Sequence, residues 1–110
     1  LDVGHAFLAA PYWHGATFLD GVRTVAPWVR HVHLHDNFGR LDDLSDGLED
    51  RLIFGEADNH LPPGWGDIPL REAAAILKGA GYEGWYLVEI RPRYDDYLAE
   101  ALAAARAVLG

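Results

Sequence analysis

The sequence contains no cysteine and no long apolar run. Without cysteine, disulfide bonds and thiolate metal sites are excluded, so any metal site must be built from histidines and carboxylates. No apolar segment approaches the roughly 20 residues that a membrane-spanning helix needs, and no signal peptide is visible. We therefore expect no contact with a membrane and a cytoplasmic location.

Positive charge is also scarce. The 110 residues carry 9 Lys and Arg against 17 Asp and Glu, which gives a net charge of −8. Such a surface repels phosphate backbones, so nucleic-acid binding is disfavoured. The sequence is 50% hydrophobic and 24% charged, as is ordinary for a globular protein. Its length suits a single domain, over residues 1–110, with one small core.

Apolar spacing and turn residues predict an alternating order of elements. We expect strand-like residues 1–4, a helix over 17–26, a strand over 29–35, a long loop over 36–67, a helix over 69–79, a strand over 84–90 and a helix over 94–109. This alternation indicates an α/β fold with a parallel sheet and covering helices. Because Leu1 already reads as strand, we expect the sequence to be a fragment of a longer chain.

Three polar residues, Asp2, His33 and Glu89, stand at the ends of the expected strands. Chemistry in parallel α/β folds gathers at such ends, and two carboxylates with an imidazole suit a divalent metal. A buried Glu89 needs a partner, because an unpaired buried carboxylate is costly, and a cation is one. The alternative for a strand histidine is a packed, hydrogen-bonded side chain, and this is our interpretation of His31.

The expected long loop holds further candidates. Asp58 and His60 have a spacing that lets both side chains turn toward one point, although they are equally compatible with a solvated loop. Trp65, in the segment PPGWG, either lines a pocket or packs in a rigid turn.

The segments LDVGH, HVHLHD, DNHLPPGWGDIPL and GYEGWYLVEI resemble, in this order, the C-terminal part of the xylose isomerase-like TIM barrel superfamily. This superfamily includes sugar isomerases, ketose 3-epimerases, inosose dehydratases and endonuclease IV-type AP endonucleases. The resemblance covers nearly the whole chain and implies about three βα units of a (β/α)8 barrel, too few to close it. It therefore implies a partner, either the N-terminal part of the barrel or another copy of the chain, without which we expect no activity.

The resemblance also implies roles for the strand-end residues. Asp2, His33 and Glu89 look like three of the four ligands of the divalent metal that family members share, and the fourth ligand, an earlier glutamate, has no match here. In such a barrel the histidines at alternate positions of the 29–35 strand face the interior. We then expect His31 packed below the ligand His33, with His35 near the mouth.

Four further residues receive roles from the same resemblance. His5 looks like the histidine that contacts substrate in the epimerases and binds a further zinc in the endonucleases. Asp58 and His60 resemble the pair that completes that further zinc site. Arg40 lies near the position of a substrate-binding arginine of the epimerases. If the chain is an isomerase or epimerase, Trp65 is in addition a candidate wall of the substrate pocket.

These observations leave three functions open. The first is a sugar or sugar phosphate isomerase or epimerase, in which Mn²⁺, Mg²⁺, Co²⁺ or Zn²⁺ stabilises an enediolate, with Glu89 and His5 as catalytic residues. The second is a multi-zinc phosphodiesterase acting on AP-site DNA, which the scarcity of basic residues disfavours. The third is a degenerate paralogue that binds metal or a partner without catalysis.

Overall fold

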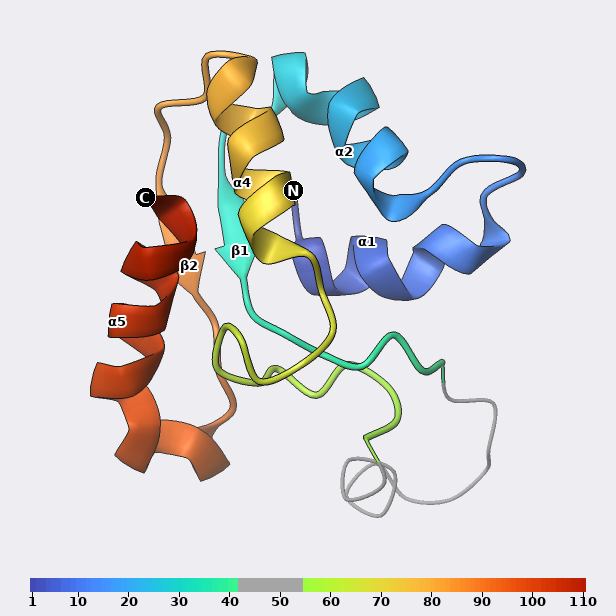
Figure 1. The fold of residues 1–110 in the computed structure, drawn as a ribbon. Helices are drawn as coiled ribbons and strands as arrows, with labels where there is room; N and C mark the ends of the chain where they lie inside the picture. Colours follow the sequence, from blue (N-terminus) through green and yellow to red (C-terminus); the bar gives the residue numbers. More distant parts are fainter. Residues whose placement is uncertain (42–54) are drawn as a thin grey trace.

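The computed structural model describes residues 1–41 and 55–110. Its elements, in chain order, are α1 (Val3–Ala9), η1 (Ala10–Tyr12), α2 (Phe18–Val25), η2 (Ala26–Trp28), β1 (Val32–Leu34), α4 (Leu70–Gly79), β2 (Tyr86–Val88), η3 (Pro92–Tyr97) and α5 (Leu98–Leu109) (Figure 1). The helices expected over 17–26 and 69–79 are confirmed, and the last helix begins with a 3-10 segment. Both strands are shorter than expected.

A small parallel sheet organises the chain. The register of β1 and β2 pairs Val32 with Tyr86, His33 with Leu87 and Leu34 with Val88. On the other edge of β1, Asp2 forms a parallel bridge with His33, whose backbone N–H donates to the Leu1 carbonyl at 2.9 Å. Three extended segments therefore lie side by side with β1 in the middle, and parallel strands with covering helices confirm the expected α/β class.

The prediction of a strand over residues 1–4 was wrong from Val3 onward, where α1 begins. Asp2 is the N-cap of α1, because its carboxylate accepts the backbone N–H of His5 at 2.8 Å. The first backbone N–H groups of a helix have no partner within the helix, and the Asp2 side chain supplies one. In a strand, the same N–H groups would need a neighbouring strand as their partner. The extended segment is thus a single bridge, and His5 lies within α1 rather than after a strand.

Helices cover one face of the sheet. In Figure 1, α4 lies over β1 and α5 runs beside β2, and α4 packs against both α2 and α5. Val32 and Leu34 of β1 point into this core, where both are essentially buried, and Tyr86 and Val88 of β2 pack against it. In the part of the chain that the structure describes, no helix is both long enough and apolar enough to span a membrane.

The opposite face of the sheet is not covered by these helices. Leu87 is 48% exposed and Trp85 is 82% exposed. Because side chains alternate along a strand, His33 and Glu89 share this face with Leu87. The candidate site is therefore built on the open face of the sheet and at the ends of its strands.

Candidate functional site

The first cluster at the strand ends consists of Asp2, His33 and Glu89, which we call the strand-end group. His33 Nδ1 lies 3.0 Å from Glu89 Oε2 and 3.7 Å from Asp2 Oδ2. One ligand atom from each residue lies within 4.8 Å of the others. The sheet register produces this convergence, since Asp2 bridges to His33 on one side and the Glu89 N–H donates to the Leu34 carbonyl on the other. The arrangement is suitable for one divalent cation.

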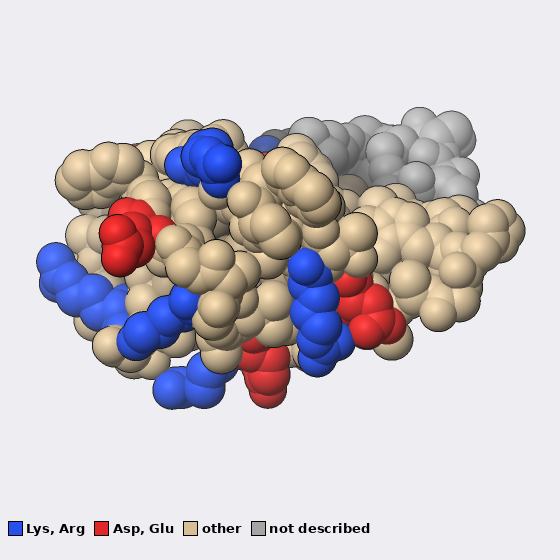
Figure 2. All heavy atoms as spheres, turned by 90° about the horizontal axis from the view of Figure 1, so that it is seen from above, with Lys and Arg blue, Asp and Glu red and all other residues tan. Residues whose placement is uncertain are grey.

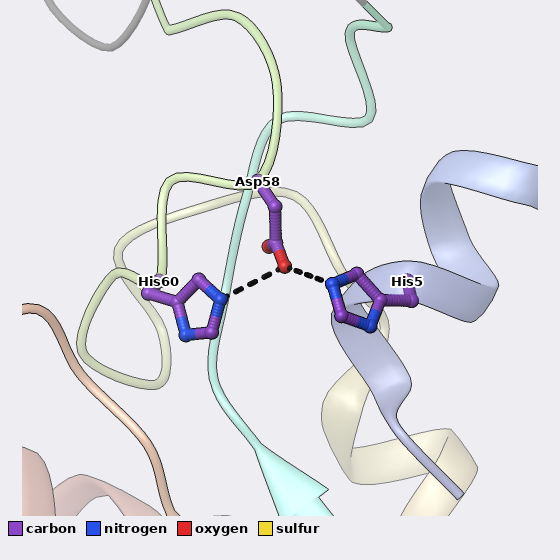
Figure 3. A group of neighbouring side chains, drawn as sticks. All are labelled: His5, Asp58 and His60. Carbon is purple, nitrogen blue, oxygen red and sulfur yellow. Dashed lines mark ion pairs between the residues drawn. The ribbon is translucent and has the colours of Figure 1, made fainter. Parts of the chain in front are cut away.

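The second cluster consists of His5, Asp58 and His60, which we call the loop group. Figure 3 shows both imidazoles directed at one carboxylate oxygen: Asp58 Oδ2 lies 2.9 Å from His5 Nε2 and 3.0 Å from His60 Nε2. Burial alone would raise the pKa of Asp58, but the imidazoles of His35 and His60 beside the carboxylate hold it well below its usual range. The close contact with Asp58 in turn raises the pKa of His60. Asp58 is therefore ionised at neutral pH and attracts a positive charge.

The two groups are linked through shared contacts. His5 Nδ1 lies 3.1 Å from Asp2 Oδ2, so His5 of the loop group also contacts the strand-end group. His60 Nδ1 lies 3.1 Å from the backbone carbonyl of Glu89. A carbonyl can only accept, so His60 Nδ1 carries the proton, and in the neutral ring Nε2 presents a lone pair to Asp58.

This hydrogen-bonding pattern fits a cation. Metal-binding histidines commonly donate their other ring N–H to a backbone carbonyl, which fixes the tautomer. His60 has this arrangement. The lone pair on His60 Nε2 then faces Asp58 Oδ2, which is also an acceptor, at 3.0 Å. Two acceptors this close repel each other unless a proton or a metal ion lies between them. Among the described residues, Asp58 Oδ2 and His35 Nδ1 are also buried atoms without a hydrogen bond. The donor set of imidazoles and carboxylates therefore fits a divalent metal.

The backbone around Asp58 is held in an uncommon conformation. Ala57 and His60 have φ values of 59° and 47°, a left-handed region that costs an L-residue about 1–2 kcal/mol. The chain after β2 fixes this segment, because Arg91 N–H donates to the His60 carbonyl at 3.2 Å and Arg91 Nη2 donates to the Asp58 carbonyl at 3.0 Å. Such strain is typically kept where the direction of a side chain matters.

Sequence analysis missed Arg91 as a support of the loop and also missed His35 as a member of the site. His35 is fully buried, and its Nε2 lies 3.1 Å from Asp58 Oδ1. Its ring stacks on that of His60 with centroids 4.0 Å apart. Alternation along the strand did put His35 on the same face as His33, and this was the available signal, but its partner in the loop is 23 positions away.

Asp36 and Asn37, just after β1, hold the loops around the site. The Asp36 carboxylate accepts backbone N–H groups from Asn37, Gly64 and Ile68 at 2.9–3.1 Å. Burial raises the pKa of Asp36, while these donors act in the opposite direction. Asn37 Nδ2 donates to Asp58 Oδ1 at 3.2 Å. The polar side chains after β1 thus connect the sheet to two turns of the following loop.

The remaining predicted residues lie elsewhere. The ring of His31 meets that of His33 edge-on, with centroids 5.2 Å apart, but His31 is exposed on the open face of the sheet, so it is not packed as expected in the part of the chain that the structure describes. His35 lies directly after β1, on the side of the strand end as expected, and is fully buried there. Trp65 packs against Tyr94 and Tyr97 and donates to Glu100 at 3.3 Å.

Arg40 is exposed, in the loop after β1, and its carbonyl accepts the Ala57 N–H at 2.8 Å. Its backbone thus supports the segment that carries Asp58. Neither Arg40 nor Trp65 belongs to the two groups of candidate ligands, and a substrate role for either stays a prediction.

A comparison of the sequence with protein families agrees with the parallel α/β arrangement described above. The family model described as "Xylose isomerase-like TIM barrel" matches residues 1–108. The chain belongs to this family. Its α/β architecture is accordingly that of part of a TIM barrel, as the sequence motifs predicted.

Curated relatives of this xylose isomerase-like chain include an epimerase. Fructoselysine 3-epimerase from Escherichia coli O157:H7 is 32% identical over 112 residues, which cover 98% of this chain and 40% of the relative. An uncharacterised protein from Mycobacterium bovis is 31% identical over 117 residues, covering 96% of this chain and 36% of the relative. The chain therefore spans about two fifths of the length of these relatives. No solved structure matches it.

Proposed function

We propose that the protein containing this chain is a divalent-metal-dependent isomerase or epimerase of sugars or sugar phosphates that works by proton transfer through an enediolate. The observation that carries this proposal is the strand-end group, in which two carboxylates and an imidazole converge at the ends of parallel strands. The epimerase named among the relatives favours the same class of substrate. The proposal concerns the whole protein, to which this chain contributes part of the site.

In this proposal Asp2, His33 and Glu89 hold the cation. Mn²⁺, Mg²⁺, Co²⁺ or Zn²⁺ supplies a Lewis acid, which stabilises negative charge on neighbouring substrate oxygens. Glu89 is also the acid and base on one side of the substrate, because its side chain is 39% exposed and a free carboxylate oxygen can remove a proton from carbon and return it. The proton leaves the carbon next to the substrate carbonyl.

His5 is the second catalytic residue in this proposal. Its side chain is 65% exposed, the most exposed of the two groups, and contacts with Asp2 and Asp58 fix both ring nitrogens. A substrate hydroxyl can hydrogen-bond to Nδ1 in place of Asp2, while Nε2, on the side of Asp58, keeps the ring in position. The acidic surface suits a neutral polyol, and a phosphorylated substrate would need basic residues such as Arg40.

The test is exchange of a carbon-bound proton with solvent. The natural protein, loaded with Mn²⁺, is incubated in D₂O with a panel of ketoses, ketose phosphates and fructosamine derivatives, and deuterium in the sugar is followed by NMR. We expect incorporation at the carbon beside the carbonyl, lost in Glu89→Gln and in His33→Ala. The exposed His14→Ala variant is the matched control and should keep wild-type exchange. No incorporation with any member of the panel would contradict the proposal.

A phosphodiesterase acting on AP-site DNA is the second candidate, and the loop group is the observation that favours it, since it offers a place for a second cation. Charge speaks against it. In the view of Figure 2, Lys and Arg side chains are scattered among neutral surface and acidic side chains rather than joined into one basic face. Cleavage of a duplex containing an AP site by the Zn²⁺-loaded natural protein, abolished in His60→Ala, would establish this function instead.

A further inference from the structure

His35 occupies a position between the two groups of candidate ligands. It follows β1 directly, is fully buried and stacks on His60 with an angle of 10° between the rings. Its Nε2 atom lies 3.1 Å from Asp58 Oδ1 and 3.6 Å from Asp2 Oδ1, and its Nδ1 atom lies 3.8 Å from Glu89 Oε2. One imidazole thus stands among three carboxylates.

The contacts of Asp58 divide between its two oxygens. Oδ1 receives His35 Nε2 and the Asn37 amide at 3.1 and 3.2 Å. Oδ2 is left for His5 and His60 (Figure 3). Because both groups on Oδ1 come from the buried segment after β1, they fix the rotation of the carboxylate. That rotation decides whether Oδ2 points between the two imidazoles of the loop group.

Gly4 supplies an independent sign that this contact is required. A Cβ atom at this position would lie 2.0 Å from His35 Nε2 and 2.9 Å from Asp58 Oδ1. Gly4 lies within α1, where glycine costs about 1 kcal/mol relative to alanine. The positive φ that often explains a glycine is not present here. The missing side chain is what leaves room for the pair of His35 and Asp58.

We propose that His35 is a positioning residue, which holds Asp58 by a hydrogen bond so that the loop group can bind a divalent cation. This inference rests on the metal dependence in the proposed function, which places a cation at the strand-end group, and it assigns a further cation to the loop group together with the residue that orders its ligands. His35 does not itself contact substrate in this proposal. Its Nε2–H donates to Asp58, and the remaining carboxylate oxygen and the imidazoles of His5 and His60 face the cation.

The test is Zn²⁺ binding to the metal-free natural protein, measured by isothermal titration calorimetry, with His60→Ala to identify the loop-group ion. His35→Leu removes the hydrogen bond and should weaken this ion's binding about 10- to 100-fold, as is usual for residues that orient metal ligands. His35→Gln carries an amide N–H near the position of Nε2 and should stay within about threefold of wild type. His14→Leu removes an exposed imidazole and serves as the control.

Gly4 gives a second, separate variant. Gly4→Ala should weaken the same ion as much as His35→Leu does, because the new Cβ displaces His35 from Asp58. Gly79→Ala is the matched control, since Gly79 is also helical and a Cβ there meets nothing within 4 Å. If His35→Leu does not fold, His35→Asn, whose shorter side chain cannot reach Asp58, takes its place beside His35→Gln.

Three results would overturn the inference. A folded His35→Leu protein that binds the loop-group ion as tightly as wild type shows that Asp58 needs no such support. Equal losses in His35→Leu and His35→Gln show that the imidazole acts in another way, for example as a ligand. Zn²⁺ binding that is the same in wild type and His60→Ala means that the loop group holds no ion. None of these results requires a sugar, so they are distinct from a failure of the exchange assay.

Discussion

Replacement of Asp36 is the sharpest test of how the site is supported. Its fully buried carboxylate accepts three backbone N–H groups: Asn37 at 3.0 Å and Ile68 at 3.1 Å on Oδ1, and Gly64 at 2.9 Å on Oδ2. Asp36→Ala removes all three acceptors. A buried donor left unsatisfied costs about 1–3 kcal/mol, and the donors of Asn37 and Ile68 are in buried contacts.

The expected loss for Asp36→Ala is therefore about 3–5 kcal/mol, because water can reach the part-buried Gly64 N–H and because the variant no longer buries a carboxylate. Asp36→Asn keeps an amide oxygen for two of the donors and turns an NH₂ group toward Gly64. It should cost about 1–2 kcal/mol. A domain has only about 5–15 kcal/mol of stability in total, so the alanine variant is near the limit of folding.

The assay is urea unfolding of the natural protein, followed by circular dichroism, with the exposed Asp67→Asn as control. We expect the free energy of unfolding to fall in the order wild type, Asp36→Asn, Asp36→Ala, with the control within about 0.5 kcal/mol of wild type. An alanine variant within 1 kcal/mol of wild type, or an asparagine variant as unstable as alanine, would refute the assignment of these hydrogen bonds.

Three further predictions concern the fold, and each is measured by the same urea unfolding. Gly66→Ala places a Cβ 2.4 Å from a backbone oxygen. It should lower the free energy of unfolding more than Gly64→Ala, whose Cβ meets nothing within 4 Å and which loses only about 1–2 kcal/mol through its φ of +89°. Equal losses in the two variants would show that the turn at Gly66 relaxes. Leu34→Ala, at a position only 1% exposed, should lose about 2–5 kcal/mol, and a smaller loss would mean that the core closes over the cavity. The Thr17 backbone N–H holds the pKa of Asp20 below its usual 3.8, so Asp20 stabilises the fold above this pH and loses that effect as the pH falls below it. The difference in stability between wild type and Asp20→Asn should therefore shrink on acidification, and a difference independent of pH would contradict the capping box.

Local patterns account for much of the fold. Phe18 and Val22 have helical spacing, Thr17 and Asp20 form a capping box at one end, and Pro27 lies just past the other, so this helix was predictable from neighbouring residues. The first three residues led to a wrong strand prediction, because Leu1 and Val3 are apolar and alternate with the polar Asp2, as in a strand. The signal that decides the structure is the capping contact from Asp2 to the backbone of His5.

The candidate site was predictable in part, for a physical reason. Asp2, His33 and Glu89 follow strands, and parallel strands bring their ends to one edge whatever the loops do. His35 could be placed on a face by alternation, but its hydrogen bond to Asp58 depends on how a long loop returns to the sheet. That path is fixed by buried polar contacts such as those of Asp36, which no local periodicity encodes.

The wide separation of the site residues along the chain has a consequence for the order of folding. His33 and Glu89 are 56 positions apart, and β1 and β2 are joined by a long crossover that includes α4. Contacts of this kind form late, because the loop entropy must be lost before the contacts stabilise anything. We therefore expect the site to form late in folding, so that the appearance of tight metal binding during refolding would report the completion of the sheet.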